Sequence, residues 1–166
     1  DHRGHGQSES GLPPHTLAAC ALDVHALLQS LELQPDVLCG HSFGGKIALE
    51  YVKQGLDNKG GGGGGSIQVP RQTWVFDSLP TAVDRHKAIG ENSVWDVIEK
   101  LGQVPLPQPS KEALVSMLIE EKRIPPAIAH WLMTSLKRMP AATAGGGGGG
   151  GAEGGLVWAF DLEVIR

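Results

Sequence analysis

The feature that most constrains this chain is a serine between glycines, placed where a short apolar run meets a helix-like segment. Residues 36–39 (Asp-Val-Leu-Cys) end at Gly40, and their length and flanks favour a buried strand. The sequence Gly-His-Ser-Phe-Gly-Gly occupies positions 40–45, and from Phe43 onward the composition is that of a helix. Strand, tight turn and helix are therefore predicted over residues 36–55.

A serine at such a turn is suited to nucleophilic chemistry. The G-x-S-x-G pattern between a strand and a helix lifts the hydroxyl of Ser42 to the helix N-terminus, whose free N–H groups can stabilise an oxyanion. Gly40 and Gly44 would leave room for the neighbouring backbone, while His41 would point to the other side of the strand. The alternative is that Ser42 only caps an ordinary helix.

The rest of the chain predicts alternating strands and helices first and helices alone afterwards. Apolar residues recur at intervals of three and four over residues 16–31, and Gln72–Phe76 has the composition of a strand. The further helices are expected from Asn92 or Ser93 to Leu101, from Lys111 to Lys122 with Ser110 as N-cap, and from Pro126 to Met139. We therefore divide the chain into an α/β core over 1–82, a helical insert over 83–144, a glycine-rich insert over 145–155 and a final apolar segment over 156–166.

Two uninterrupted glycine runs, 60–65 and 145–151, account for the high glycine content of 24 residues. Because glycine loses the most conformational entropy on ordering, we expect both runs to be disordered insertions in surface loops. The two cysteines, Cys20 and Cys39, lie in apolar stretches and predict a buried, reduced pair without chemistry.

Composition and charge exclude several classes of function. The 14 basic and 18 acidic residues give a net charge of −4, which argues against nucleic-acid binding. No segment approaches the roughly 18 consecutive apolar residues of a membrane span. His2 and His5 lie close together, but no second pair completes the three or four ligands of a zinc site, so we expect no metal.

Four segments together resemble the α/β-hydrolase superfamily. The opening Asp-His-Arg-Gly-His-Gly-Gln-Ser at 1–8 resembles the D-x-R-G-H-G-x-S loop of many members, and residues 40–45 resemble their nucleophile elbow. Residues 74–80 (Trp-Val-Phe-Asp-Ser-Leu-Pro) are similar to the corresponding segment in a branch of small acyl-ester hydrolases with a helical cap. Within that branch, this chain most resembles plant and algal proteins. Residues 158–162 look like the segment that re-enters the core.

The resemblance implies a partial α/β-hydrolase fold, a mainly parallel sheet with flanking helices plus a helical cap, incomplete at both ends. Ser42 matches the nucleophile and the Phe43 N–H one oxyanion donor. Asp77 matches the acid in some members, or it only caps a turn. The second oxyanion donor is expected upstream of Asp1, and the catalytic histidine and the alternative acid downstream of Arg166.

The implied activity is hydrolysis of a small-molecule acyl ester through an acyl-enzyme, without a cofactor. The helical cap would correspond to residues 83–144. Five of its side chains would line an acyl pocket, or they would only pack the cap: Trp95, Leu114, Met117, Trp131 and Leu132. The alternative function is a catalytically inactive fragment or pseudoenzyme that binds a partner. The resemblance suggests a soluble intracellular protein, with the mitochondrion and the chloroplast as candidate compartments.

Overall fold

Two compact units make up the computed structural model, which describes residues 1–57, 67–81, 90–139 and 154–165. The sheet unit comprises His2 and residues 11–83, and the helical unit comprises Asp1, residues 3–10 and residues 84–166. Each unit has a hydrophobic core of its own. The two glycine runs, which we predicted to be disordered, lie outside the described residues.

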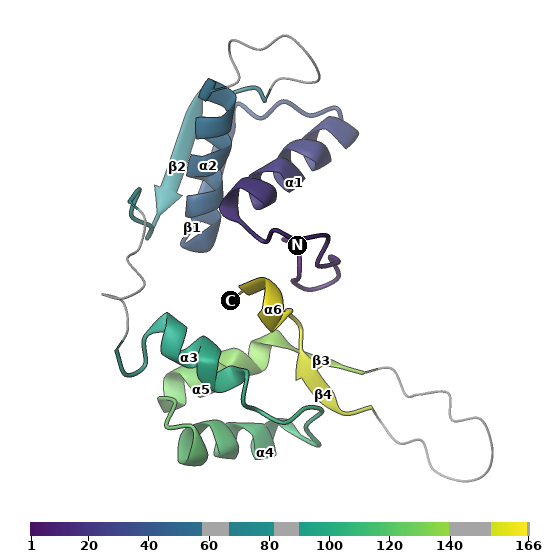
Figure 1. Ribbon diagram of the computed structural model, residues 1–166, viewed down its shortest axis with the longest axis vertical. Helices are drawn as coiled ribbons and strands as arrows, with labels where there is room; N and C mark the ends of the chain where they lie inside the picture. Colours follow the sequence, from purple (N-terminus) through teal and green to yellow (C-terminus); the bar gives the residue numbers. More distant parts are fainter. Residues whose placement is uncertain (58–66, 82–89, 140–153, 166) are drawn as a thin grey trace, which may run out of the picture. The chain divides into compact units, whose positions relative to one another are not determined.

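The sheet unit joins a helix to a β-α-β arrangement. Its elements are α1 (Leu17–Ser30), β1 (Val37–His41), α2 (Phe43–Asp57) and β2 (Gln72–Phe76). The two strands are parallel, with Val37 opposite Gln72 and His41 opposite Phe76. α2 packs on both strands and α1 packs on α2 (Figure 1). The predicted strand–turn–helix and the predicted second strand are confirmed.

The core of the sheet unit lies between the two helices and one face of the sheet. Tyr51 on α2 is 2% exposed and packs with Cys20 and Ala21 from α1 and with Ile67. α1 begins after Thr16, whose side chain accepts a hydrogen bond from the N–H of Ala19 at 3.2 Å. The amphipathic pattern of residues 16–31 therefore buries its apolar side against α2.

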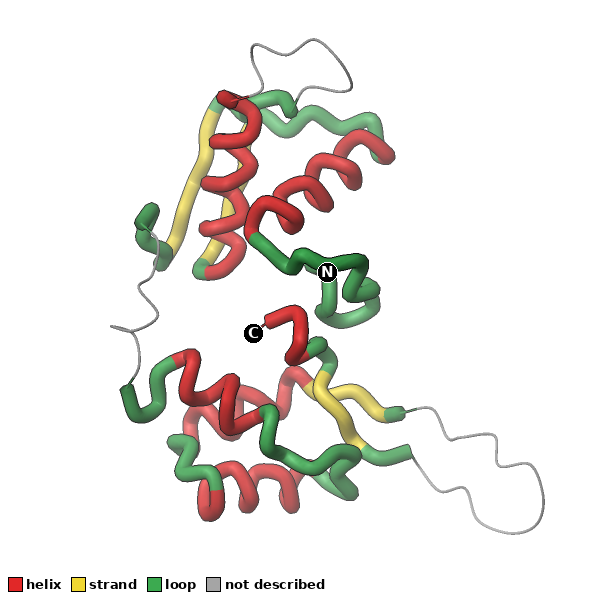
Figure 2. The backbone as a smooth tube through the Cα atoms, viewed as in Figure 1, coloured by secondary structure: helices red, strands yellow, loops and turns green. Residues whose placement is uncertain are grey.

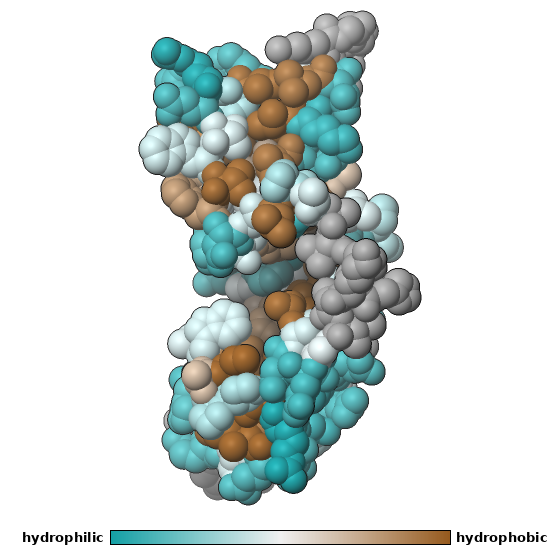
Figure 3. Space-filling view, turned by 90° about the vertical axis from the view of Figure 1, so that its left-hand side faces the viewer, coloured by the Kyte–Doolittle hydropathy of each residue, from teal (hydrophilic) through white to brown (hydrophobic). Residues whose placement is uncertain are grey.

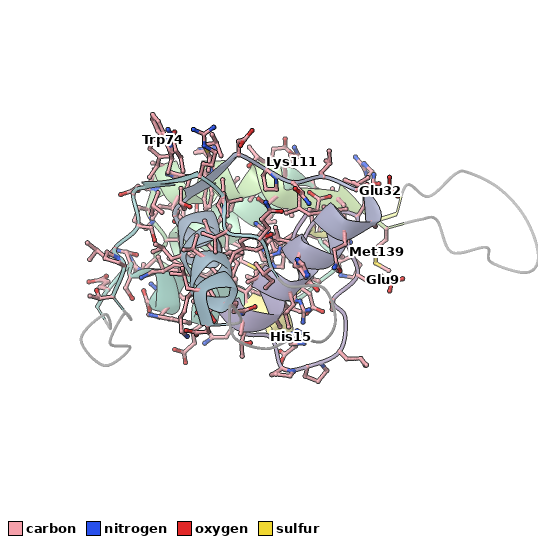
Figure 4. All side chains as sticks on the ribbon, turned by 90° about the horizontal axis from the view of Figure 1, so that it is seen from above. Glu9, His15, Glu32, Trp74, Lys111 and Met139 are labelled. Carbon is pink, nitrogen blue, oxygen red and sulfur yellow. The ribbon has the colours of Figure 1, made fainter. Side chains whose placement is uncertain are left out.

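The opposite face of the sheet is open, which corrects the prediction of a buried strand. Because side chains alternate along a strand, Cys39 lies on the face away from α2 and is exposed, whereas only Cys20 is buried. Trp74 and Phe76, on the same face of β2, are 52% and 48% exposed. Trp74 projects outward in Figure 4, and hydrophobic surface is visible over this unit in Figure 3.

The helical unit consists of short helices and one antiparallel hairpin, seen in yellow in Figure 2. Its elements are α3 (Val94–Leu101), α4 (Lys111–Ser116), the π-helical turn η2 (Met117–Glu121), α5 (Pro126–Leu132), the 3-10 turn η3 (Met133–Ser135), β3 (Leu136–Arg138), β4 (Leu156–Trp158) and α6 (Leu162–Ile165). Its core contains Leu114 and Leu118, both fully buried, and Trp158 from the hairpin. The predicted cap Ser110 accepts a hydrogen bond from the N–H of Ala113, and α3 begins after Ser93, whose side chain accepts from the N–H of Asp96.

The prediction of one helix from Pro126 to Met139 is wrong. The helix ends at Leu132, and residues 136–138 form β3, which pairs with β4 through Leu136 opposite Trp158. The hydroxyl of Thr134 donates to the carbonyl of Trp131 at 2.7 Å, which offers the backbone an alternative to a further helical turn. Within the described residues, no helix is long and apolar enough to cross a membrane.

An ion pair in α3 gives a testable pH dependence. The hydrogen bond from Lys100, 2.7 Å away, lowers the pKa of Asp96, and the backbone N–H of Asn92 lowers it further. A lowered native pKa means that this contribution to stability is present above the ordinary value of 3.8 and is lost as pH falls through the native value. In an NMR titration, K100Q should therefore raise the pKa of Asp96, while K137Q should not. An Asp96 pKa that K100Q leaves in place would contradict the pairing.

The opening loop is tied to the segment after β4. The N–H of Asp161 donates to the carbonyl of Gly4, and the N–H of Gly6 donates to the carbonyl of Ala159, each at 2.6 Å. The hydroxyl of Ser10 donates to the carboxylate of Asp161 at 2.6 Å. Gly4 has a φ of +69°, and a Cβ there would come within 2.9 Å of Val164. These contacts explain why the loop needs glycine at position 4 and closes on residues 159–161.

Candidate active site

Ser42 occupies the turn between β1 and α2 in a strained backbone conformation. Its φ of +52° lies in the left-handed region, which residues other than glycine seldom adopt. Three hydrogen bonds hold it there: its N–H donates to the carbonyl of Phe76 at 2.8 Å, and its carbonyl accepts from the N–H groups of Gly45 at 3.0 Å and Lys46 at 3.3 Å. Strand pairing and the first turn of α2 therefore fix the serine from both sides.

The glycines around Ser42 are not equivalent. A Cβ on Gly40 would collide with the carbonyl of Gly44, and a Cβ on Gly45 would come within 2.9 Å of the Ser78 side chain. A Cβ on Gly44 would meet nothing within 4 Å. The prediction that Gly44 makes room for neighbouring backbone is therefore wrong, because the close approach occurs at Gly45, one residue further along the helix.

This difference predicts opposite outcomes for two alanine substitutions. G40A should lower the free energy of unfolding by about 1–3 kcal/mol, because the backbone of the turn has to shift. G44A should leave stability unchanged or raise it slightly, because alanine favours a helix over glycine. Thermal and urea denaturation of the two variants and the parent protein checks this. Equal destabilisation by both substitutions would contradict the described packing.

The hydroxyl of Ser42 and the N–H of Phe43 are both available at this turn. Ser42 is exposed, and among the described residues neither its hydroxyl nor the Phe43 N–H makes a hydrogen bond. Phe43 is the first residue of α2, so its N–H has no acceptor within the helix. The Phe43 ring is 49% exposed and meets the His2 ring edge-on, with centroids 6.1 Å apart. A donor and a nucleophile thus stand side by side.

Asp77 follows β2 as Ser42 follows β1. Because His41 is paired with Phe76 in the parallel register, Ser42 and Asp77 come directly after paired residues at the carboxyl ends of adjacent strands. Asp77 has a φ of +50°, and its side chain is 88% exposed. The structure therefore brings the candidate nucleophile and the candidate acid to the same edge of the sheet.

His41 lies beside Asp77, an arrangement that the sequence analysis missed. The distance from His41 Nε2 to Asp77 Oδ2 is 3.8 Å, and the His41 side chain is 71% exposed. Two adjacent parallel strands could have indicated this contact. In their register His41 is paired with Phe76, the residue before Asp77. A protonated His41 would attract the Asp77 carboxylate at this distance.

The predicted pocket walls have different surroundings in the helical unit. Leu114 is fully buried and Leu132 is 3% exposed, so both pack the core of that unit, with Met117 against it. Trp131 is 66% exposed and Trp95 is partly exposed. Packing thus accounts for the two leucines, whereas the two tryptophans keep surface that a substrate could contact.

Among the described residues, no histidine is hydrogen-bonded to the Ser42 side chain. No group of three His, Cys, Asp or Glu side chains in this part of the chain could hold a metal ion. His5 Nδ1 lies 3.0 Å from the carbonyl of Arg3, which ties it to the opening loop. His130 lies near the end of α5, and His86 falls outside the described residues.

Two cavities lie away from the serine. One of about 270 Å³ in the sheet unit is lined by residues of α1, α2 and the following loops, including His25 and Tyr51. Burial raises the pKa of Tyr51, which keeps its hydroxyl protonated. The other, about 210 Å³, lies between the opening loop and residues 159–161 of the helical unit. Neither Ser42 nor Asp77 lines either of these two cavities.

Two known proteins are similar to this chain in sequence or in structure. A non-heme chloroperoxidase from Streptomyces lividans is 42% identical over 52 residues, which are 31% of this chain and 19% of that protein. A marine microorganism esterase of known structure matches 99% of this chain with a TM-score of 0.69 at 18% identity, and the chain covers 54% of it. The chain therefore spans about half the length of that esterase and less of the chloroperoxidase.

The family assignment comes from a match over nearly the whole chain. The model of the alpha/beta hydrolase family matches residues 1–162, which include the opening loop, the Ser42 turn, Asp77 and the segment after β4. The parallel strands β1 and β2 with α2 between them have the arrangement expected of that family. The chain belongs to the alpha/beta hydrolase family.

Proposed function

We propose that the protein carrying this chain hydrolyses carboxylic esters with Ser42 as the nucleophile. The observation that carries the proposal is the turn itself: Ser42 is exposed at a φ of +52°, next to a Phe43 N–H that has no acceptor among the described residues. Strain of this kind persists only where surrounding structure holds it, and it is concentrated at functional sites. The family match and the esterase of similar fold support the same reaction class.

The chemistry follows from the groups at the turn. Ser42 Oγ forms a bond to the acyl carbon while its proton passes to a general base, and the Phe43 N–H donates to the resulting oxyanion. The intermediate collapses by breaking the bond to the alcohol, which leaves protonated, and water then attacks the acyl-serine to release the acid. The proposal assigns the general base to a histidine outside the described residues.

Asp77 is proposed as the acid that orients this histidine. It follows β2 at the sheet edge where Ser42 follows β1, and its exposed carboxylate leaves space for an imidazole to approach. Buried or oriented carboxylates in this role hold the imidazole in the right tautomer and stabilise its charged form. No cofactor takes part, and the exposed surfaces of Trp95 and Trp131 are proposed to contact the acyl group.

An ester series tests the proposed reaction. The assay uses the longest natural protein that contains residues 1–166, because the chain spans 54% of the esterase that it resembles. We expect turnover of p-nitrophenyl acetate, butyrate or octanoate and none of p-nitrophenyl phosphate, since the proposed reaction requires an acyl carbon for Ser42 Oγ to attack. Failure to turn over any carboxylic ester would favour the alternative of a binding module without catalysis.

A further inference from the structure

Lys46 joins the Ser42 turn to the segment that follows Asp77. It lies in the first turn of α2, and its backbone N–H donates to the carbonyl of Ser42 at 3.3 Å. Its side-chain ammonium donates to the backbone carbonyls of Leu79 and Thr81, each at 2.5 Å. One residue is thus bonded at the same time to the nucleophile's backbone and to the chain just beyond the candidate acid.

The placement of a lysine here needs an explanation. A cation in the first turn of a helix faces the positive end of the helix dipole, which is unfavourable. The two carbonyls offset this cost, because an ammonium has three donors and charge-assisted hydrogen bonds are among the stronger ones. The lysine is therefore matched to the two carbonyls rather than to the helix that carries it.

Within the part of the chain that the structure describes, residues 78–81 form hydrogen bonds with Lys46 alone. Residues 78–81 belong to no helix or strand, Leu79 is 70% exposed, and Pro80 and Thr81 are exposed. Asp77 immediately precedes this segment with a φ of +50° and an 88% exposed side chain. Burial therefore does not set the direction of the Asp77 carboxylate. Apart from its 3.8 Å contact with His41, its position depends on the bonds at its two flanks: strand pairing before it and Lys46 after it.

We propose that Lys46 is a positioning residue that fixes Asp77 relative to Ser42 by holding residues 78–81 against the first turn of α2. The inference rests on the proposed function, because it assigns to Lys46 the orientation of the acid in that reaction. Lys46 contacts neither substrate nor reacting atoms in this scheme. Its effect passes through the backbone of residues 77–81 alone.

The test compares three lysine variants of the same α2 helix. K46M removes the ammonium and keeps the aliphatic chain, and K46R restores a cation with several donors. K53M is the matched control, because Lys53 lies two turns further along α2 and pairs with Glu50 at 3.4 Å. Each is measured for kcat and KM with p-nitrophenyl acetate and for backbone order by ¹⁵N heteronuclear NOE at Leu79 and Thr81.

K46M should lower the heteronuclear NOE of both amides and reduce kcat by about 10- to 100-fold, since small misplacements of a catalytic group cost this much. KM should stay within about twofold, because the acid orients the base rather than binding the ester. K46R should recover part of kcat, and K53M should match the parent protein in both measurements.

Two results would overturn the inference: amide order unchanged in K46M, or a loosened segment with an unchanged kcat. S42A and D77N measured in parallel separate its failure from that of the proposed function. If S42A keeps its activity, the proposed nucleophile fails, and if D77N keeps its activity, the proposed acid fails and the role of Lys46 falls with it. If S42A and D77N lower kcat and K46M does not, only the role of Lys46 is refuted, and the proposed function stands.

Discussion

Replacing Ser42 by alanine is expected to reduce kcat for p-nitrophenyl acetate by about 10⁵-fold or more, because the group that forms the acyl-enzyme is lost. The fold should survive, since the strained backbone is held by hydrogen bonds from the main chain of residue 42 rather than from its hydroxyl. Alanine at a φ of +52° resembles serine in its steric demand. The measurement is steady-state kinetics together with circular dichroism.

S30A provides a matched control for this variant. Ser30 is the last residue of α1, and its hydroxyl donates to the carbonyl of Leu27 at 2.8 Å. The same atom is removed from the same unit at a site with no role in the proposed reaction, so kcat should be unchanged. If the S42A variant hydrolysed esters as fast as the parent protein, Ser42 would not be the nucleophile.

Replacing Asp77 by asparagine is expected to have the second-largest effect, a loss of kcat of about 10³- to 10⁴-fold. Asparagine is the informative substitution because it tolerates the left-handed φ of +50° that position 77 requires, so that only the charge is removed. Alanine would add backbone strain to the loss of charge. If Asp77 only capped the turn, D77N would keep its kcat, since the asparagine side chain can accept the same local hydrogen bonds.

The matched control for Asp77 is Asp36, which lies at the other end of the same two strands. Its backbone carbonyl accepts from the N–H of Gln72, and D36N leaves that bond in place. D36N should keep the full kcat in the kinetics that measure D77N. A D77N protein as fast as D36N would show that Asp77 only caps the turn and that the acid lies elsewhere.

The elements around the site could be predicted because they depend on neighbours in the sequence. The strand before Gly40, the helix after Ser42 and the serine cap at Ser110 all follow from patterns a few residues long. The position of Asp77 next to Ser42 follows as well, once two parallel strands are expected. Nucleophile and acid candidates were therefore found from sequence.

Features that depend on distant pairing could not be predicted in this way. The end of α5 at Leu132 depends on β3 pairing with β4, and the opening loop is closed by Ser10 bonding to Asp161, 151 residues away in the sequence. The bonds from Lys46 to Leu79 and Thr81 join residues 33 and 35 positions apart. Local propensity contains no information on such contacts, which tertiary packing decides.

The exposure of Cys39 was missed for a related reason. Its apolar neighbours predict burial, but a strand is buried only where another element covers its face, and α2 covers the face that carries Leu38 and Gly40. Val37 and Trp74 are exposed on the same side as Cys39. Sequence pattern gives the alternation of a strand, while the covering of each face depends on the elements packed against it.

Covalent trapping shows directly whether Ser42 is the nucleophile. The longest natural protein containing this chain is incubated with a fluorophosphonate, which forms a stable bond to an activated serine, and the adduct is located by mass spectrometry of peptides. We expect one adduct, on Ser42, and a loss of ester hydrolysis in proportion to labelling. p-Nitrophenyl acetate should protect Ser42 from labelling. An adduct on another serine that abolishes hydrolysis, or full hydrolysis after Ser42 is labelled, would contradict it.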